Sequence, residues 1–167
     1  MTEPRARRWL GSICAGVFVL LVCTAGAASG YMVWQHRVAV ADRHNAAEFV
    51  AAARQSVITL MSMNFLNAKQ DVQRVVDATT GELRDDFTKQ GGEFTAVMEQ
   101  SKVVTTAKVN GAALQSMSAD SATVLVAATS EVTNSAGAQQ EPREWRLIVT
   151  VARDGGQLKM SKVEFVP

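Results

Sequence analysis

Histidines and carboxylates are the side chains of this protein that could carry acid–base chemistry or hold a metal ion. The two histidines, His36 and His44, are eight residues apart. On a helix they share a face only loosely, whereas zinc-binding pairs usually stand at positions i and i+4. No histidine follows residue 44, and the two cysteines, Cys14 and Cys23, lie near the N-terminus. A Ser-His-Asp or Cys-His nucleophile is therefore excluded from the remainder of the chain.

The carboxylates form no convincing catalytic pair. Four aspartates lie within a short stretch: Asp71, Asp77, Asp85 and Asp86. Adjacent residues of a helix point about 100° apart, so Asp85 and Asp86 cannot face each other. The Val-rich C-terminal part also contains carboxylates, at Glu131, Glu144 and Glu164. Each belongs to the set of alternating strand residues that is mainly polar. Because isomerase-like chemistry needs a carboxylate inside a pocket, we expect no catalytic residues, no cofactor, no metal and no enzymatic activity.

A run of 27 residues, Trp9 to Gln35, contains no Asp, Glu, Lys, Arg or His. About 20 apolar residues are enough for a helix to cross a bilayer. Aromatic residues stand at both ends of the run, as interfacial anchors do, with Trp9 before it and Tyr31 and Trp34 near its end. The sequence therefore predicts a tail at residues 1–8 and a transmembrane helix at residues 9–35.

A cleavable signal peptide is the alternative reading of this segment. Arginines precede the apolar run, and the small residues 25–27 (Ala-Gly-Ala) resemble a cleavage site. Apolar character resumes beyond that point, up to Trp34, which favours an uncleaved anchor. Lipidation at Cys23 is disfavoured because Val22 stands where a small residue is usual.

Charge predicts the orientation of the anchor and the kind of partner. Residues 1–8 hold three arginines, whereas the other flank has only Arg37 and Arg43. The positive-inside rule then puts the N-terminus in the cytoplasm and the C-terminal domain outside, as expected of a single-pass inner-membrane protein. Of the 17 Lys and Arg only three precede residue 9, and of the 16 Asp and Glu only one does. The domain is nearly neutral, so we expect no nucleic acid partner.

The middle of the chain has helical periodicity. A stalk and first helix are predicted over residues 36–63. Their stripe, with spacings of three and four, is formed by Val50, Ala53, Val57, Leu60 and Asn64. Asn67 is predicted to cap a second helix, which ends at Thr80-Gly81 because glycine closes a helix at low cost. Two shorter helices, 82–90 and 93–100, are expected on either side of a break at Gly91-Gly92.

After residue 101 apolar and polar residues alternate with a period of two, which predicts strands. They span residues 102–116, with a bulge at Asn110-Gly111, then 121–134, a third strand through 145–152, and 158–166. Asp154-Gly155 is a hairpin signal. Helices followed by a four-stranded antiparallel meander predict an α+β domain over residues 64–167, in which the helices cover one face of a curved sheet to make a cone. Its expected lining is Trp145, Leu147 and Val149.

The segment Asp71–Phe87 (DVQRVVDATTGELRDDF) resembles the signature of the Mce-associated membrane proteins of actinobacteria. In that family a helix ending in Ala-x-Thr-Gly is followed by a short amphipathic helix closing on Phe. Thr80, Gly81 and Phe87 occupy these positions. The resemblance extends to the single N-terminal membrane helix, the Val-rich sheet and the Val-x-Phe-Val-Pro C-terminus. Physically, Thr80-Gly81 is interpreted as a helix stop that sets the angle between two helices.

The resemblance implies a cone-shaped domain similar to nuclear transport factors and to the periplasmic assembly factor of type IV secretion systems. It also implies a non-enzymatic, membrane-anchored accessory subunit that stabilises or recruits an Mce-type lipid or sterol transport complex. Its partners would be Mce transporter subunits or a permease, together with membrane lipid. One alternative is an extracytoplasmic module that holds an acyl chain in the cone. The other is an isomerase-like enzyme. The family brings no established catalytic residues.

Overall fold

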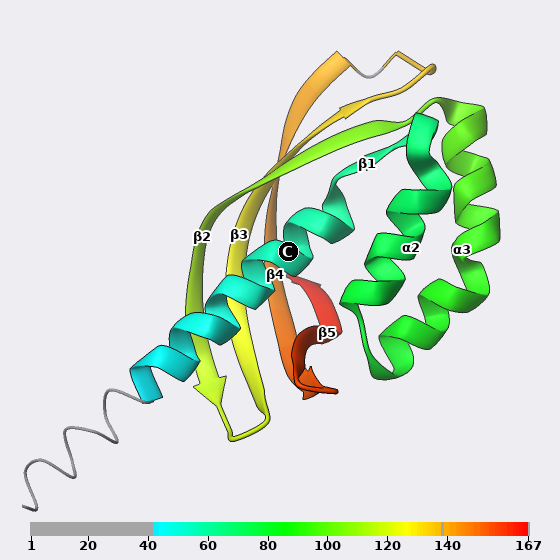
Figure 1. Ribbon diagram of the computed structural model, residues 1–167. Coiled ribbons are helices and arrows are strands. Elements are labelled where there is room, and N and C mark those ends of the chain that lie inside the picture. The colour runs from blue at the N-terminus through cyan, green and yellow to red at the C-terminus, as the bar shows by residue number, and fades with distance from the viewer. Residues whose placement is uncertain (1–41, 138, 167) are drawn as a thin grey trace, which may run out of the picture. The chain divides into compact units, whose positions relative to one another are not determined.

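The computed structural model describes residues 42–137 and 139–166 (Figure 1). The predicted tail at 1–8, the predicted transmembrane helix at 9–35 and the alternative cleavage site lie outside the described residues. Within the described range, no helix has the length and apolar character needed to cross a bilayer. The domain described below is the compact unit Asn45–Pro167.

The N-terminal helix is described over residues 42–61. Phe49, Ala53 and Val57 are almost fully buried, at spacings of four residues, and Val50 and Leu60 pack partly buried beside them. The apolar part of the predicted stripe is therefore present, with Phe49 added to it, whereas Asn64 lies beyond the end of the helix. The helix ends two residues before the predicted limit of 63, because the next residues leave it to pair with a strand.

That pairing creates a strand that the sequence did not predict. β1 (Met63–Asn64) pairs antiparallel with Thr105 and Val104 of β2 (Val104–Met117). Two residues carry no recognisable alternation, so only the tertiary partner identifies them as a strand. The sheet consequently has five strands instead of four, in the order β1-β2-β3-β4-β5.

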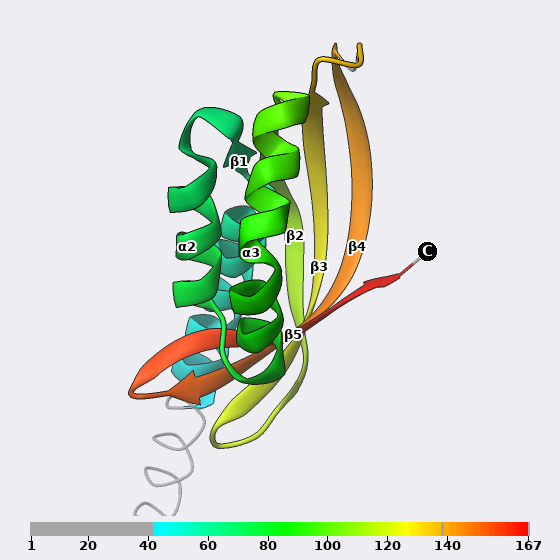
Figure 2. The same ribbon diagram turned by 90° about the vertical axis from the view of Figure 1, so that its right-hand side faces the viewer.

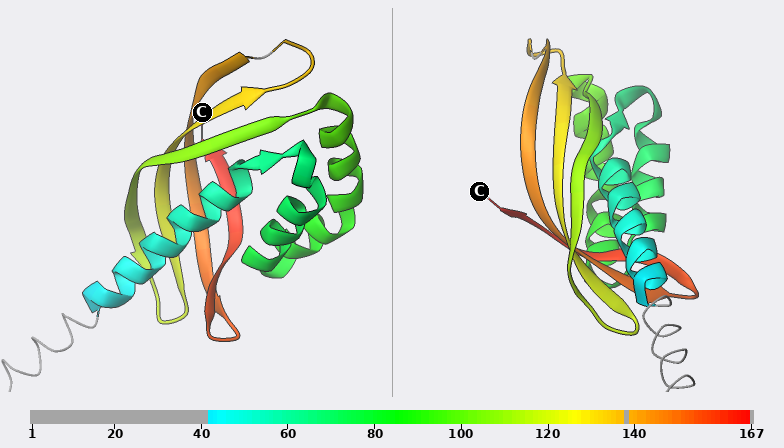
Figure 3. Two further views of the ribbon diagram at one scale, coloured as in Figure 1. Left: turned by 45° about the horizontal axis from the view of Figure 1, so that its top comes forward. Right: turned by 90° about the vertical axis from the view of Figure 1, so that its left-hand side faces the viewer.

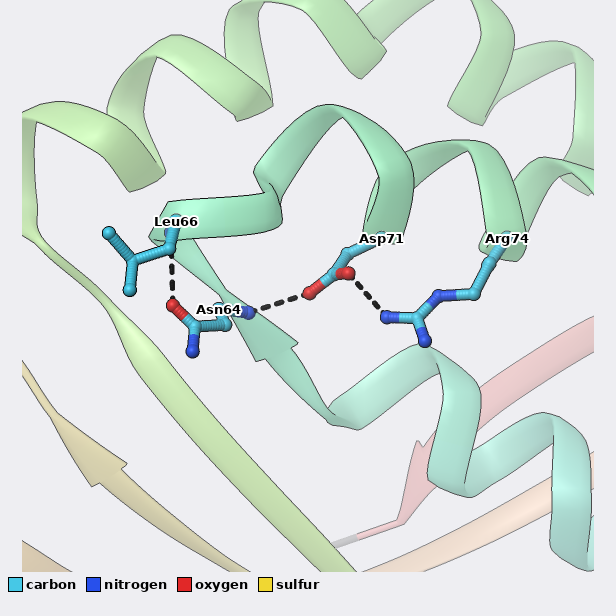
Figure 4. Close-up of polar contacts among 4 residues, drawn as sticks. All are labelled: Asn64, Leu66, Asp71 and Arg74. Carbon is cyan, nitrogen blue, oxygen red and sulfur yellow. Dashed lines mark hydrogen bonds and ion pairs between the residues drawn. The ribbon is translucent and has the colours of Figure 1, made fainter.

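A single turn of 3-10 helix, η1 (Phe65–Asn67), leads from β1 into α2 (Ala68–Ala78). Asn67 occupies the N-cap position of α2, as predicted, but its side chain makes no capping hydrogen bond. Asn64 makes one instead, since its Oδ1 accepts a hydrogen bond from the backbone N–H of Leu66 at 2.9 Å (Figure 4). The capping side chain thus serves the 3-10 turn that precedes α2.

The third helix, α3 (Gly81–Ser101), is continuous, so the predicted break at Gly91-Gly92 was wrong. α2 and α3 lie side by side (Figures 1 and 2). Gly91 is buried between them, and a Cβ built on it would lie 2.9 Å from Cγ1 of Val72. Glycine costs a helix interior about 1 kcal/mol relative to alanine. Here it lets the two helices approach closely, and the packing outweighs the cost.

The remaining strands are β3 (Ser121–Thr133), β4 (Gln139–Asp154) and β5 (Gln157–Val166), each antiparallel to its neighbour. The predicted bulge is confirmed, because the β2–β3 register shifts between Val109 and Gly111. The predicted hairpin turn is off by one residue. Asp154 pairs with Gln157, so the turn is Gly155-Gly156, whose φ angles are +57° and +81°. Two positive φ angles match the twist of the flanking strands.

All three helices lie on one face of the curved sheet, as expected for an α+β domain, and the opposite face is uncovered (Figures 2 and 3). We call these the inner and outer faces. The inner face holds the main core. The N-terminal helix packs there against sheet residues that are at most 3% exposed: Ala122, Val124, Val126, Ala128, Leu147, Val149, Val151 and Met160.

We predict opposite effects of alanine at the two adjacent glycines of α3. Gly91→Ala should destabilise the domain by about 1–3 kcal/mol, because the added methyl group collides with the stiff, buried side chain of Val72. Gly92→Ala is the matched control, since nothing lies within 4 Å of its Cβ position, and it should stabilise the domain by about 0.5–1 kcal/mol. Urea denaturation of both variants measures the difference. Equal stabilisation by the two would contradict close helix packing at Gly91.

Candidate functional site

Asp71 is the one aspartate of the predicted set that is buried, at 4% exposed. Its Oδ2 accepts a hydrogen bond from the backbone N–H of Asn64 at 2.7 Å, and its Oδ1 accepts one from the guanidinium of Arg74 (Figure 4). Oδ2 thus holds β1 against the first turn of α2, and Oδ1 is engaged by Arg74 of the same helix. This arrangement makes Asp71 a structural residue.

The other carboxylates are placed at the surface. Asp77 accepts a hydrogen bond from the side chain of Gln73 at 2.9 Å, and Asp85 and Asp86 are exposed on α3. The three strand carboxylates, Glu131, Glu144 and Glu164, are exposed too. The described residues contain no group of three His, Cys, Asp or Glu side chains that could hold a metal ion. His44 lies near the start of the described part of the N-terminal helix, and His36 lies outside the described residues.

Thr80 and Gly81 form the joint between α2 and α3, as the sequence predicts. Gly81 has φ +62°, in the left-handed region that favours glycine. The joint is also bonded to the sheet. The backbone N–H of Thr80 donates to the carbonyl of Met160 at 3.0 Å, and its hydroxyl donates to Oδ2 of Asp154 at 3.0 Å. Because these partners lie about 75 residues away on the β4–β5 hairpin, the sequence pattern could not reveal them.

Phe87, the third residue of the predicted motif, lies on α3 one to two turns after the joint. It is half-buried and packs against a second, smaller core of Met63, Ala68, Val75 and Met98. This core lies between β1, α2 and α3. The motif residues therefore orient the helical pair, and their contacts are structural.

The predicted cone lining is part of the packed interior. Leu147 and Val149 are at most 1% exposed and contact the core that contains Phe49. Trp145 is half-buried at the end of this row. Its Nε1–H donates to Oγ of Ser130 at 2.8 Å, and its ring meets Phe165 edge-on at 5.5 Å between centroids. Side chains of the N-terminal helix occupy the space over Leu147 and Val149.

Two adjoining hollows lie away from this interior, and sequence reasoning did not predict them. The first has a volume of about 510 Å³ and is almost wholly apolar, with Leu125, Ile148 and Val166 around small residues of β2 and β3. The second, of about 690 Å³, is more polar and includes Glu144 and Trp145. The two share Ala127, Arg146 and Val166. Alternation along the strands placed Leu125 opposite the core, but only the bend of the sheet makes a hollow there.

Comparison with known proteins identifies the family. A family model described as "Uncharacterized protein Rv1363c/MT1408-like" matches residues 10–167. The chain belongs to this family. It is 56% identical over 158 residues to the uncharacterized protein Rv1363c of Mycobacterium tuberculosis (strain ATCC 25618 / H37Rv), a match that covers 95% of this chain. The match covers 60% of that relative, so the chain spans less than two thirds of the relative's length.

Solved structures show the same fold at low sequence identity. An IcmL-like type IV secretion system protein from Legionella pneumophila superposes with a TM-score of 0.60 at 10% identity, covering 72% of this chain and 91% of that chain. The periplasmic domain of DotI gives 0.58 at 15% identity, covering 71% and 92%. The domain thus has the nuclear-transport-factor-like α+β fold of VirB8-type secretion domains, with helices on a five-stranded antiparallel sheet. This confirms the expected fold class at that level.

We predict that Asp71→Ala destabilises the domain by about 1–3 kcal/mol, because the backbone N–H of Asn64 loses its acceptor. Asp77→Ala is the matched control on the same helix. Asp77 is exposed and bonded only to a side chain one turn away, so its loss should cost less than about 0.5 kcal/mol. Chemical denaturation compares the two, and equal losses would show that the Asp71 tie does not stabilise the fold.

We predict that Gly81→Ala costs about 1 kcal/mol, because alanine is strained at a φ of +62°. Gly81→Asn should cost less, since asparagine tolerates the left-handed region better than other side chains. The melting temperatures of the two variants test this order. A neutral alanine variant would mean that the joint relaxes to a different backbone conformation.

Proposed function

We propose that this protein is a non-enzymatic, membrane-anchored accessory subunit that stabilises or recruits an Mce-type lipid or sterol transport complex in the cell envelope. The domain would stand on the extracytoplasmic side of the inner membrane and bind Mce transporter subunits or a permease. The finding that supports the proposal most directly is the filled interior of the domain. Phe49, Ala53 and Val57 occupy the inner face of the sheet and are at most 1% exposed.

A filled interior favours a scaffold over an enzyme of the same fold class. An active site of that kind needs an ionisable group inside a water-excluding pocket. The polar side chains buried in the described part of the domain are Ser56, Asp71, Thr79, Thr95 and Ser130. Asp71 is the only ionisable one, and β1 and Arg74 engage both of its oxygens. A domain built in this way acts through its surface.

The surface offers apolar side chains for contact with other proteins. Leu66 is 74% exposed, Val97 is 53% exposed and Phe94 is 42% exposed. Exposed apolar side chains of this size are available for contact with a partner protein. Similarity to components of secretion systems is consistent with such a role, because those proteins share the fold.

Lipid binding in the cone is the alternative function. A ligand pocket is normally concave, largely preformed and about 300–1,000 Å³ in volume. An acyl chain over Leu147 and Val149 would have to displace the side chains of the N-terminal helix from the core. Mass spectrometry of protein purified under native conditions tests this alternative, and a stoichiometric lipid with the N-terminal helix displaced would favour it over the scaffold.

Affinity purification from envelope membranes tests the scaffold. The full-length tagged chain should recover Mce or permease subunits, because the domain holds the contact surface. A fusion of residues 1–44 to an unrelated globular protein is the control for the N-terminal segment alone. The proposal is contradicted if the control recovers these subunits equally well, or if the full chain recovers none under conditions that preserve the complex.

A further inference from the structure

The outer face of the sheet has an apolar centre that no helix of the described chain covers (Figure 2). Two rows of paired strand residues form this centre: Ala113, Leu125, Ile148 and Glu164, then Gly111, Ala127, Arg146 and Val166. The rows beside them are polar: Lys108, Thr129 and Glu144 on one side, and Thr123, Thr150 and Lys162 on the other. An exposed apolar patch with a polar rim marks a contact surface or a ligand-binding groove.

The centre is hollowed, which favours a small ligand over a flat protein surface. The hollow has a volume of about 510 Å³ and an almost wholly apolar lining. Ligand sites typically have volumes of about 300–1,000 Å³. Gly111 and Ala127 are too small to fill the space beside the larger lining residues, Leu125, Ile148 and Val166. The part of a ligand that enters this hollow must therefore be hydrocarbon.

Arg146 is the charged residue in this lining, and it also lines the adjoining, more polar hollow. It is exposed, and within the described part of the chain it forms no ion pair. An arginine stem can cover apolar surface while its guanidinium stays at the polar boundary. A guanidinium binds a carboxylate through two parallel hydrogen bonds. The arrangement therefore suits a molecule with a hydrocarbon chain and an anionic head.

Glu144 limits the charge of that head. It lies two residues from Arg146 on β4 and lines the polar hollow. Its carboxylate would repel a doubly charged phosphate more strongly than a singly charged carboxylate. Glu164, which lies across from Ile148, forms an ion pair with Lys162 at 2.7 Å, so its charge is largely compensated. A head group with a single negative charge is the best match.

We propose that the outer-face hollow binds a single-chain amphiphile with a carboxylate head, that is, a long-chain fatty acid. The hydrocarbon chain lies in the apolar hollow over Ala127, and its carboxylate accepts hydrogen bonds from the guanidinium of Arg146 at the boundary with the polar hollow. The N-terminal helix stays in place, because it packs on the opposite face of the sheet. This site goes beyond the proposed scaffold role, since ligand binding here and recovery of transporter subunits can each fail without the other.

Photolabelling of the full-length protein in phosphatidylcholine vesicles tests the proposal. The probe is palmitic acid with a diazirine in its chain, used at alkaline pH so that the carboxyl group is ionised. Mass spectrometry should find the label on the strand residues that line the hollow, at 111–113, 125–127 and 146–148. Excess unlabelled palmitate should prevent this labelling. Label on the N-terminal helix instead, or label that palmitate does not displace, overturns the proposal.

Filling the hollow should exclude the probe. Ala127→Leu should reduce the labelling by roughly tenfold, because its side chain would occupy the space of the hydrocarbon chain. Since Ala127 is exposed, the melting temperature should not change. Ala96→Leu is the matched control, at an exposed position on α3, and should leave the labelling unchanged. Full labelling of the Ala127→Leu protein contradicts binding in this hollow.

A second probe, hexadecanol with the same diazirine, separates the head group from the chain. Arg146→Gln should lower labelling by the acid roughly tenfold, through loss of a charge-assisted hydrogen bond, and leave labelling by the alcohol unchanged. Glu144→Gln should raise labelling by the acid, because a like charge is removed. Arg143→Gln is the matched control, an exposed arginine of β4 outside both hollows. An equal loss with both probes, or an equal loss in the Arg143→Gln protein, overturns the assignment of Arg146 to the head group.

Discussion

The packing of the N-terminal helix on the inner face of the sheet is the contact on which the rest of the domain depends. Phe49, Ala53 and Val57 join three strands into one core. Burial of each large apolar side chain contributes roughly 1.5–3 kcal/mol, and the domain has no cysteine for a disulfide. The same packing also fills the space between the N-terminal helix and the sheet. The packing of this helix on the sheet therefore both stabilises the domain and leaves the space over this core filled.

Two polar ties then fix the helical pair α2–α3 relative to that core. Asp71 holds β1 at one end of the pair, and Thr80 holds the β4–β5 hairpin at the other. Gly91 allows the two helices to approach between these ends. The Thr80-Gly81 motif therefore has a structural role, because it connects the two helices to the sheet. A helical pair held to the sheet at both ends is consistent with the proposed role in binding other proteins.

The outer face differs from the inner face because no helix of the described chain covers its apolar centre. Leu125, Ile148 and Val166 border a hollow, and Glu144 and Arg146 stand beside it.

The sequence by itself determined the order of elements, the fold class, the inward positions of Leu147 and Val149 and the bulge at Asn110-Gly111, because periodicity and turn chemistry are local. It also placed the helix stop at Thr80-Gly81. Tertiary structure decided what depends on distant partners. Met63–Asn64 became a strand through β2, Gly91-Gly92 stayed helical because α2 packs against it, and Asp71 became a structural residue through β1. The hollow on the outer face arises from the curvature of the whole sheet, which no local pattern encodes.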